Sequence, residues 1–342
     1  MIDIARRTQV VEGARPGDID FDAILRGQSP TVFKGMARDW PLVQEGLQSP
    51  AAAMAYLNRF QAGHPVVAYV GPPQIKGRFF YDDAGGMNFR SERVTLDAFM
   101  ARIAASLDEP QAPSLYVGST DVDTYLPGLR AENDLGLDPV LFGEQGPLVG
   151  LWLGNRTTAT AHYDMSNNIA CCVVGRRRFT LFPPGQAANL YPGPLEPTPG
   201  GQVVSMVDFR EPDPDRFPNF EKALAAAQVA DLEAGDVLVY PALWWHHVEA
   251  LDPFNVLINY WWNTAPAFMD TPMNTLLHGL LSLRDRPDHE KQAWRALFDY
   301  YLFGPADRAG AHLPEPMRGP LGPLDALQAR RLRALLLNRL NR

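Results

Sequence analysis

The segment TAHYDMSNNIACCVVGRRRFTLFPP places His162 and Asp164 two positions apart, in a run that is otherwise typical of a buried strand. Side chains at positions i and i+2 of a strand point to the same face of a sheet. An imidazole and a carboxylate on one buried face are costly unless a partner compensates them, and a bound metal ion is one such partner. A metal site here requires a third ligand from elsewhere in the chain.

The adjacent histidines His246 and His247, in GDVLVYPALWWHHVEAL, can supply that ligand. They are predicted to begin a strand that follows a proline-containing bend. Neighbouring strand residues face opposite ways, so only one of the two can join His162 and Asp164. Two histidines and one carboxylate around a metal, with the remaining positions open, form the ligand set of non-heme Fe(II) oxygenases.

The composition is that of a soluble globular protein with one large domain or two smaller ones. The chain has 342 residues, of which 46% are hydrophobic and 20% charged, and its 28 glycines and 31 prolines predict many turns. A net charge of −8 argues against a general nucleic-acid binder. The sequence has neither an apolar run long enough to span a bilayer nor the apolar segment of a signal peptide, so we expect a cytoplasmic protein.

The order of the predicted elements indicates a β core followed by helices. Ser49 and Pro50 have the residue types that begin a helix. Strand-like runs then follow without intervening helices, among them GRFFYDD, which predicts an antiparallel sandwich or barrel. The runs NIACCVV and RFTLFPP flank Gly175 and are expected to form a hairpin. Beyond residue 266, apolar residues recur at helical spacing over 273–281 and 294–302.

Four segments in the same order, AHYDMSNNIACCVVGRRRFTLFPP, SMVDFREPDPDRFPNF, GDVLVYPALWWHHVEAL and INYWW, resemble a known family. They are similar to the JmjC-type, cupin-fold Fe(II)/2-oxoglutarate oxygenases, and within them to the subgroup around the asparaginyl hydroxylase of hypoxia-inducible factor. The resemblance runs from Phe33 to Trp262. It implies a mainly β fold with α: a double-stranded β-helix (jelly-roll) core with N-terminal α/β elements and a C-terminal helical extension.

The resemblance also implies how the chain is divided. Residues 1–265 would form the JmjC/cupin-like catalytic domain, including the N-terminal elements. Residues 266–342 would form the helical region, which builds a homodimer in the relatives, and the apolar stripes at 273–281 and 294–302 suit that role.

Carried over residue by residue, the family pattern makes His162, Asp164 and His246 the iron ligands, so that His247 faces away. It also implies that 2-oxoglutarate chelates the metal and needs a cation for its far carboxylate. Arg177 stands where the family has a lysine; it keeps the charge but is longer and can bind a carboxylate through two hydrogen bonds.

Further polar residues match the co-substrate pocket of the family. These are Tyr116, Asn168 and Asn259. Ala159 stands where a threonine or serine is common, so one hydrogen bond is either lost or supplied by Thr160 or another group. Trp261 has the same strand parity as Asn259, and we expect Trp261 and Thr160 in the substrate pocket.

The expected activity is therefore hydroxylation of a C–H bond with Fe(II), 2-oxoglutarate and O2, releasing succinate and CO2. Val203 and Val204 fall where the asparaginyl hydroxylase has polar contacts to its peptide, so we expect the substrate to bind differently. A protein side chain, a free amino acid and a small metabolite all remain open. The alternatives are a metal-binding cupin of another activity, such as an isomerase or hydrolase, and a non-catalytic binding module.

Overall fold

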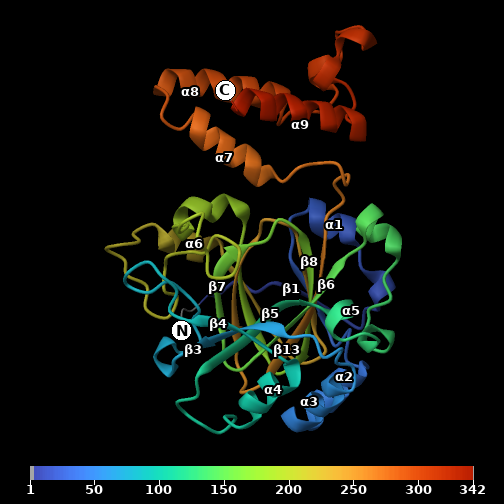
Figure 1. Ribbon diagram of the computed structural model, residues 1–342, viewed down its shortest axis with the longest axis vertical. Helices are drawn as coiled ribbons and strands as arrows, with labels where there is room; N and C mark the ends of the chain where they lie inside the picture. The colour runs from blue at the N-terminus through green and yellow to red at the C-terminus, as the bar shows by residue number, and fades with distance from the viewer. Residues whose placement is uncertain (1–3, 342) are drawn as a thin grey trace. The chain divides into compact units, whose positions relative to one another are not determined.

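In the computed structural model, which describes residues 4–341, the strands form two sheets (Figure 1). The larger sheet contains, in spatial order, β1 (Gln9–Glu12), β2 (Thr31–Lys34), β11 (Val237–Tyr240), β8 (Asn167–Val174), β13 (Asn255–Trp262), β6 (Leu148–Gly154), β5 (Ser114–Asp121), β3 (Val66–Gly71) and β4 (Arg90–Val94). The smaller sheet contains β10 (Gln228–Leu232), β9 (Arg177–Phe182), β12 (Trp245–Ala250) and β7 (Thr158–Tyr163). Residues 1–3 and 342, which the predicted domains include, lie outside the described residues.

The two sheets share an apolar interior to which both contribute side chains. In β8, Ala170 and Cys172 point into this interior, toward Phe179 and Leu181 of β9. Their neighbour Cys171 belongs instead to the core on the other face of the larger sheet. A strand buried on both faces reads as a continuous apolar run, as NIACCVV does. The predicted fold, mainly β with α and consistent with a jelly-roll core, is confirmed.

Helices cover the outer face of the larger sheet. The helices of this part of the chain are α1 (Phe21–Arg26), α2 (Pro41–Gln48), α3 (Pro50–Asn58), α4 (Leu96–Ala104), α5 (Val122–Tyr125) and α6 (Phe220–Ala226). Of these, α6 packs against the smaller sheet instead. Figure 1 shows α2, α3 and α4 gathered together, and their apolar residues join one core with β8 and β13. Ser49 caps α3 as predicted, because its side chain accepts a hydrogen bond from the Ala52 backbone N–H.

The predicted hairpin at Gly175 is wrong. β8 pairs with β11 and β13, and β9 pairs with β10 and β12, so the turn leads from one sheet to the other. Gly175 has a φ of +75°, and a Cβ there would lie 2.4 Å from Oδ1 of Asn255. A local turn signal shows that the chain reverses direction, but the strands that pair with β8 and β9 lie far away in the sequence.

The predicted strand GRFFYDD is also wrong, since this segment forms only isolated bridges. The segment folds back on itself instead: the backbone N–H of Asp82 donates to the carbonyl of Gly86, and that of Phe80 donates to Oδ1 of Asn88. These local hydrogen bonds take the place of the hydrogen bonds that a strand would have made to a neighbouring strand.

The chain divides into two compact units, the first ending at Asn263 and the second beginning at Thr264. The helices of the second unit are α7 (Pro272–Ser282), α8 (Asp288–Tyr301) and α9 (Ala326–Leu340). Among its described residues only Ala309 and Gly310 are buried, so this unit has almost no core of its own. Nowhere in residues 4–341 is a helix both long and apolar enough to cross a membrane.

Candidate functional site

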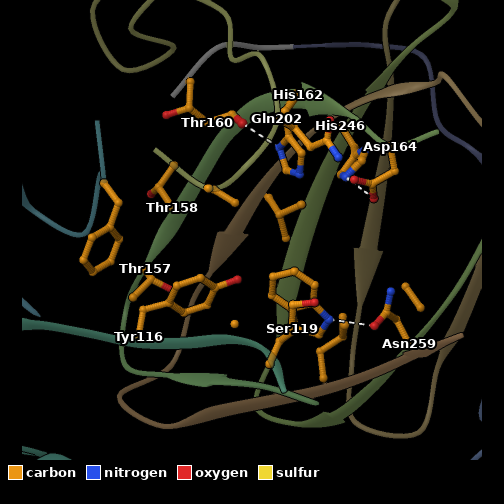
Figure 2. Close-up of a pocket in the computed structure, with 18 of the residues that line it drawn as sticks. Tyr116, Ser119, Thr157, Thr158, Thr160, His162, Asp164, Gln202, His246 and Asn259 are labelled. Carbon is orange, nitrogen blue, oxygen red and sulfur yellow. Dashed lines mark hydrogen bonds and ion pairs between the residues drawn. The ribbon is translucent and has the colours of Figure 1, made fainter. Parts of the chain in front are cut away.

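Three side chains with metal-binding atoms meet at the ends of β7 and β12. His162 and His246 are directly opposite each other in the pairing of these strands, with ring centroids 4.2 Å apart. Asp164 lies just beyond the end of β7, and its Oδ2 is 3.5 Å from Nε2 of His246. The potential ligand atoms of the three residues all lie within 4.8 Å of one another. Figure 2 shows the three side chains converging.

The backbone fixes which nitrogen of each imidazole is free to bind a metal. Nδ1 of His162 is 2.8 Å from the carbonyl oxygen of Thr160, and Nδ1 of His246 is 3.0 Å from that of Trp244. A carbonyl oxygen can only accept, so each Nδ1 carries the hydrogen and each Nε2 keeps its lone pair. Burial, helped by the neighbouring His162, lowers the pKa of His246 to about 4, which keeps this imidazole neutral.

His247 lies on the other side of β12, as strand alternation predicts. It is buried, and its ring stacks on Phe209 with a centroid distance of 4.3 Å and an interplanar angle of 18°. It does not belong to the group of possible metal ligands found among the described residues. Of the two adjacent histidines, the structure therefore brings only His246 to His162 and Asp164.

A shift in strand register explains how Ala159 and His162 both reach the pocket. His246 is opposite His162 and Val248 is opposite Ala159, so β7 has one more residue than β12 in this interval. Such a bulge changes the alternation of side chains. Both Ala159 and Thr160 consequently line the pocket, and the buried Thr160 hydroxyl has no hydrogen-bond partner among the described residues.

Arg177, the first residue of β9, brings a buried cation to the same pocket. Its side chain is 4% exposed, and burial lowers its pKa from the ordinary value. Neither Nε nor Nη2 has a hydrogen-bond partner within the part of the chain that the structure describes. Two unpaired nitrogens on a buried guanidinium are costly, and a carboxylate that binds in the pocket would satisfy them. The predicted 2-oxoglutarate carboxylate fits this requirement.

Aromatic side chains form much of the remaining wall of this cavity, which has a volume of about 320 Å³. Tyr116 stacks on Phe79 with a centroid distance of 5.8 Å, and Trp152 and Trp261 meet edge to face at 5.4 Å. Burial raises the pKa of the Tyr116 hydroxyl, so it stays protonated and can donate a hydrogen bond. Figure 2 shows that Tyr116 lies in the pocket with the two histidines.

The two predicted asparagines are linked to each other and to Asp164. Nδ2 of Asn168 donates to the hydroxyl of Tyr240 at 2.6 Å and lies 3.5 Å from Oδ2 of Asp164. Asn259 donates to Oδ1 of Asn168 and accepts a hydrogen bond from the indole of Trp152. Tyr240 and Trp152 were not predicted as site residues, because each contacts its asparagine across strands that only the fold brings together.

The structure thus places every predicted site residue in one pocket. Its lining includes His162, Asp164, His246, Tyr116, Asn168, Arg177, Asn259, Trp261 and Thr160. The roles assigned to these residues remain predictions. Val204 also lines the pocket, whereas its neighbour Val203 is buried in a separate apolar cluster.

Comparison with known proteins shows which family shares this arrangement. Residues 17–268 match the model of the cupin-like domain family. HSPB1-associated protein 1 of Homo sapiens is 40% identical over 251 residues, which cover 70% of this chain and 49% of the relative. JmjC domain-containing protein D of Dictyostelium discoideum is 26% identical over 237 residues, covering 65% and 49%. Lysine-specific demethylase JMJ31 of Arabidopsis thaliana is 31% identical over 129 residues, covering 36% and 23%.

The chain spans about half the length of the first curated relatives it matches. The family match nevertheless includes both strands that carry the metal-binding side chains and the strand that carries Arg177. Together with the converging His162, Asp164 and His246, it confirms the resemblance read from the sequence. The chain belongs to the cupin-like, JmjC-type domain family.

Proposed function

We propose that this protein is an Fe(II)- and 2-oxoglutarate-dependent oxygenase that hydroxylates a C–H bond of a protein side chain, an amino acid or a small metabolite. In the overall reaction, 2-oxoglutarate, O2 and the substrate C–H group would give succinate, CO2 and the hydroxylated product. Membership of the JmjC-type family supports an oxygenase-type function.

One observation carries the proposal: a set of two histidines and one carboxylate shares a pocket with a buried arginine whose Nε and Nη2 lack partners among the described residues. The first feature is the ligand set of non-heme iron oxygenases. The second is an anchor for a carboxylate. A metal-binding cupin that used no dicarboxylic co-substrate would leave the buried charge of Arg177 without a purpose. A non-catalytic module would leave the three ligand side chains equally unexplained.

The pocket residues would bind the metal and the co-substrate. His162, Asp164 and His246 would hold Fe(II). Arg177 would bind the far carboxylate of 2-oxoglutarate, and the hydroxyl groups of Tyr116 and Thr160 are able to add hydrogen bonds. When bound, Fe(II) and 2-oxoglutarate supply the oxidising power that an unactivated C–H bond requires. Aromatic side chains, among them Trp152 and Trp261, line this site and would limit the access of water once the substrates are bound.

The direct test is anaerobic addition of Fe(II) to the metal-free protein, followed by titration with 2-oxoglutarate. We expect a visible charge-transfer band that saturates with 2-oxoglutarate and is absent in His246→Ala. In air, the same samples should form succinate once the substrate is supplied. Binding of Fe(II) without any band on adding 2-oxoglutarate would contradict the proposal and would favour a cupin of another activity.

We also propose that the second unit forms a homodimer. Large apolar side chains of α7 and α8 are exposed there, including Leu276, Leu281, Trp294, Leu297 and Tyr301. With only Ala309 and Gly310 buried among its described residues, the unit does not cover these side chains itself. A second copy of the same helices would cover them without any further partner.

A further inference from the structure

Trp152 begins a line of hydrogen bonds that runs through the interior of the pocket to the candidate metal ligand Asp164. Its indole Nε1 donates to Oδ1 of Asn259 at 2.7 Å. Nδ2 of Asn259 donates to Oδ1 of Asn168 at 3.3 Å, and Nδ2 of Asn168 lies 3.5 Å from Oδ2 of Asp164. Figure 2 shows the bond that reaches Asn259.

The chemistry of the two ends determines the direction of every bond between them. An indole N–H can only donate, so Asn259 must turn its amide oxygen toward Trp152 and its NH2 toward Asn168. Asn168 must then accept with its own oxygen, which leaves its NH2 for the hydroxyl of Tyr240 at 2.6 Å and for the carboxylate of Asp164 at 3.5 Å. An ionised carboxylate can only accept, so the far end requires the same direction. Neither amide can be reversed while Trp152 remains in place.

Two glycines make room for Trp152 and its partner. A Cβ at Gly150 would lie 2.8 Å from Oδ1 of Asn259 and 3.4 Å from Nε1 of Trp152. A Cβ at Gly118 would lie 2.9 Å from the other edge of the Trp152 ring. Neither glycine has a positive φ, so the backbone does not demand glycine at these positions. Glycine at these two positions leaves the space that the Trp152 ring and its hydrogen bond to Asn259 occupy.

We propose that Trp152 is a positioning residue, which sets the orientation of the Asn259 and Asn168 amides and thereby directs an N–H toward the carboxylate of Asp164. This proposal rests on the proposed metal site. Without the indole donor, as in Trp152→Phe, only the carboxylate of Asp164 still sets the direction of the line, and the Asn259 amide is free to reverse. A reversed Asn259 would set its oxygen against that of Asn168, so the N–H that Asn168 directs to Asp164 is held less firmly and the carboxylate loses part of the support that orients it toward the metal.

Trp261→Phe is the matched control. Trp261 lines the same pocket and touches Trp152, but its Nε1 has no hydrogen-bond partner among the described residues. Both substitutions remove an indole from the same wall, and only Trp152→Phe removes a donor from the line of hydrogen bonds. A purely steric or structural role of the wall would affect the two variants alike.

The first measurement is calorimetric titration of the metal-free full-length proteins with Co(II), which reports metal binding without any turnover. We expect Trp152→Phe to bind Co(II) roughly 10-fold more weakly than wild type, the lower end of the effect usual for outer-shell partners of a metal ligand. Trp261→Phe should match wild type. Equal affinities of the two variants would overturn the proposal.

The second measurement needs no metal and separates this inference from the proposed function. In NMR spectra of 15N-labelled metal-free protein, the side-chain amide signals of Asn168 and Asn259 should move in Trp152→Phe and stay in place in Trp261→Phe. In wild type, the indole proton of Trp152 should lie downfield of that of Trp261, as expected for a hydrogen-bonded N–H. Unmoved asparagine signals in folded Trp152→Phe would overturn the inference. If that variant does not fold, the wild-type spectrum still decides, because a Trp152 indole proton without a sign of hydrogen bonding would also overturn it. Wild type that binds no Co(II) would refute the metal site, and the amide signals would then decide the orientation alone.

Discussion

His162 and His246 face each other across the pairing of β7 with β12, with their ring centroids 4.2 Å apart. Each ring donates from Nδ1 to the carbonyl oxygen two residues before it in the chain. The Nε2 atoms of the two histidines are thus left free to bind a metal, and the carboxylate of Asp164 completes the group of three possible ligands. Backbone carbonyl groups therefore orient both imidazoles toward the carboxylate.

Replacing His162 or Asp164 by alanine should abolish metal binding and turnover without unfolding the protein. Each residue is one of three possible ligands, so the loss of metal affinity should exceed the roughly 10- to 100-fold that removal of an outer-shell partner costs. Calorimetric titration with Co(II) measures the affinity, and circular dichroism checks the fold. His247→Gln is the control, since that side chain faces away from the metal site. Full activity in either alanine variant would refute the assigned ligand set.

Arg177→Ala should raise the 2-oxoglutarate concentration needed for half-maximal turnover. A hydrogen bond to a charged group contributes about 1.5–3 kcal/mol, which corresponds to a rise of roughly 10- to 100-fold. Arg177→Lys should recover part of the loss, because it keeps the cation. The neighbouring Arg178 pairs with Asp231 in an exposed ion pair, so Arg178→Ala should leave the requirement unchanged. An identical requirement in Arg177→Ala and Arg178→Ala would remove Arg177 from the co-substrate site.

Gly150→Ala should weaken metal binding although residue 150 touches no metal ligand. The added methyl group would overlap Oδ1 of Asn259 at 2.8 Å and push its amide away from Trp152. We expect a loss of Co(II) affinity of roughly 10-fold, as for other outer-shell changes. Gly200→Ala is the matched control, because Gly200 also lines the pocket and a Cβ there meets no atom within 4 Å. Similar affinities for the two variants would show that the space at Gly150 is not needed.

Leu281→Glu and Leu297→Glu should convert a homodimer into a monomer. Both side chains are exposed, and a charge buried in an apolar interface without a partner is strongly unfavourable. Sedimentation or light scattering measures the mass of wild type and variants. Val140→Glu, which replaces an exposed apolar residue of the first unit, should not change it. A monomeric wild type would rule out the homodimer.

The sequence was most informative where the relevant physics is local. The alternation of side chains in a strand predicted that His246 and His247 face opposite ways, and Cys171 and Cys172 do lie in separate cores. Residue types alone indicated the cap of α3 at Ser49. The resemblance to JmjC-type oxygenases then assigned His246 rather than His247, and the structure brings His246 to the other two ligands.

Predictions failed where a segment's partners are distant in the chain. Gly175 signals a turn, yet β8 and β9 belong to different sheets because other strands occupy their edges. The bulge that turns Ala159 into the pocket depends on how β7 pairs with β12, which no pattern within β7 reveals.

The sequence by itself determined the chemistry that this protein can offer: the imidazoles, the carboxylate, the arginine and the family in which that set occurs. Residue types and their local spacing carry this information. Only the tertiary structure decided that Trp152 on β6, Asn259 on β13 and Asn168 on β8 form one directed line to Asp164. Hydrogen bonds between side chains depend on which strands lie next to each other and in what register, and folding of the whole chain sets both.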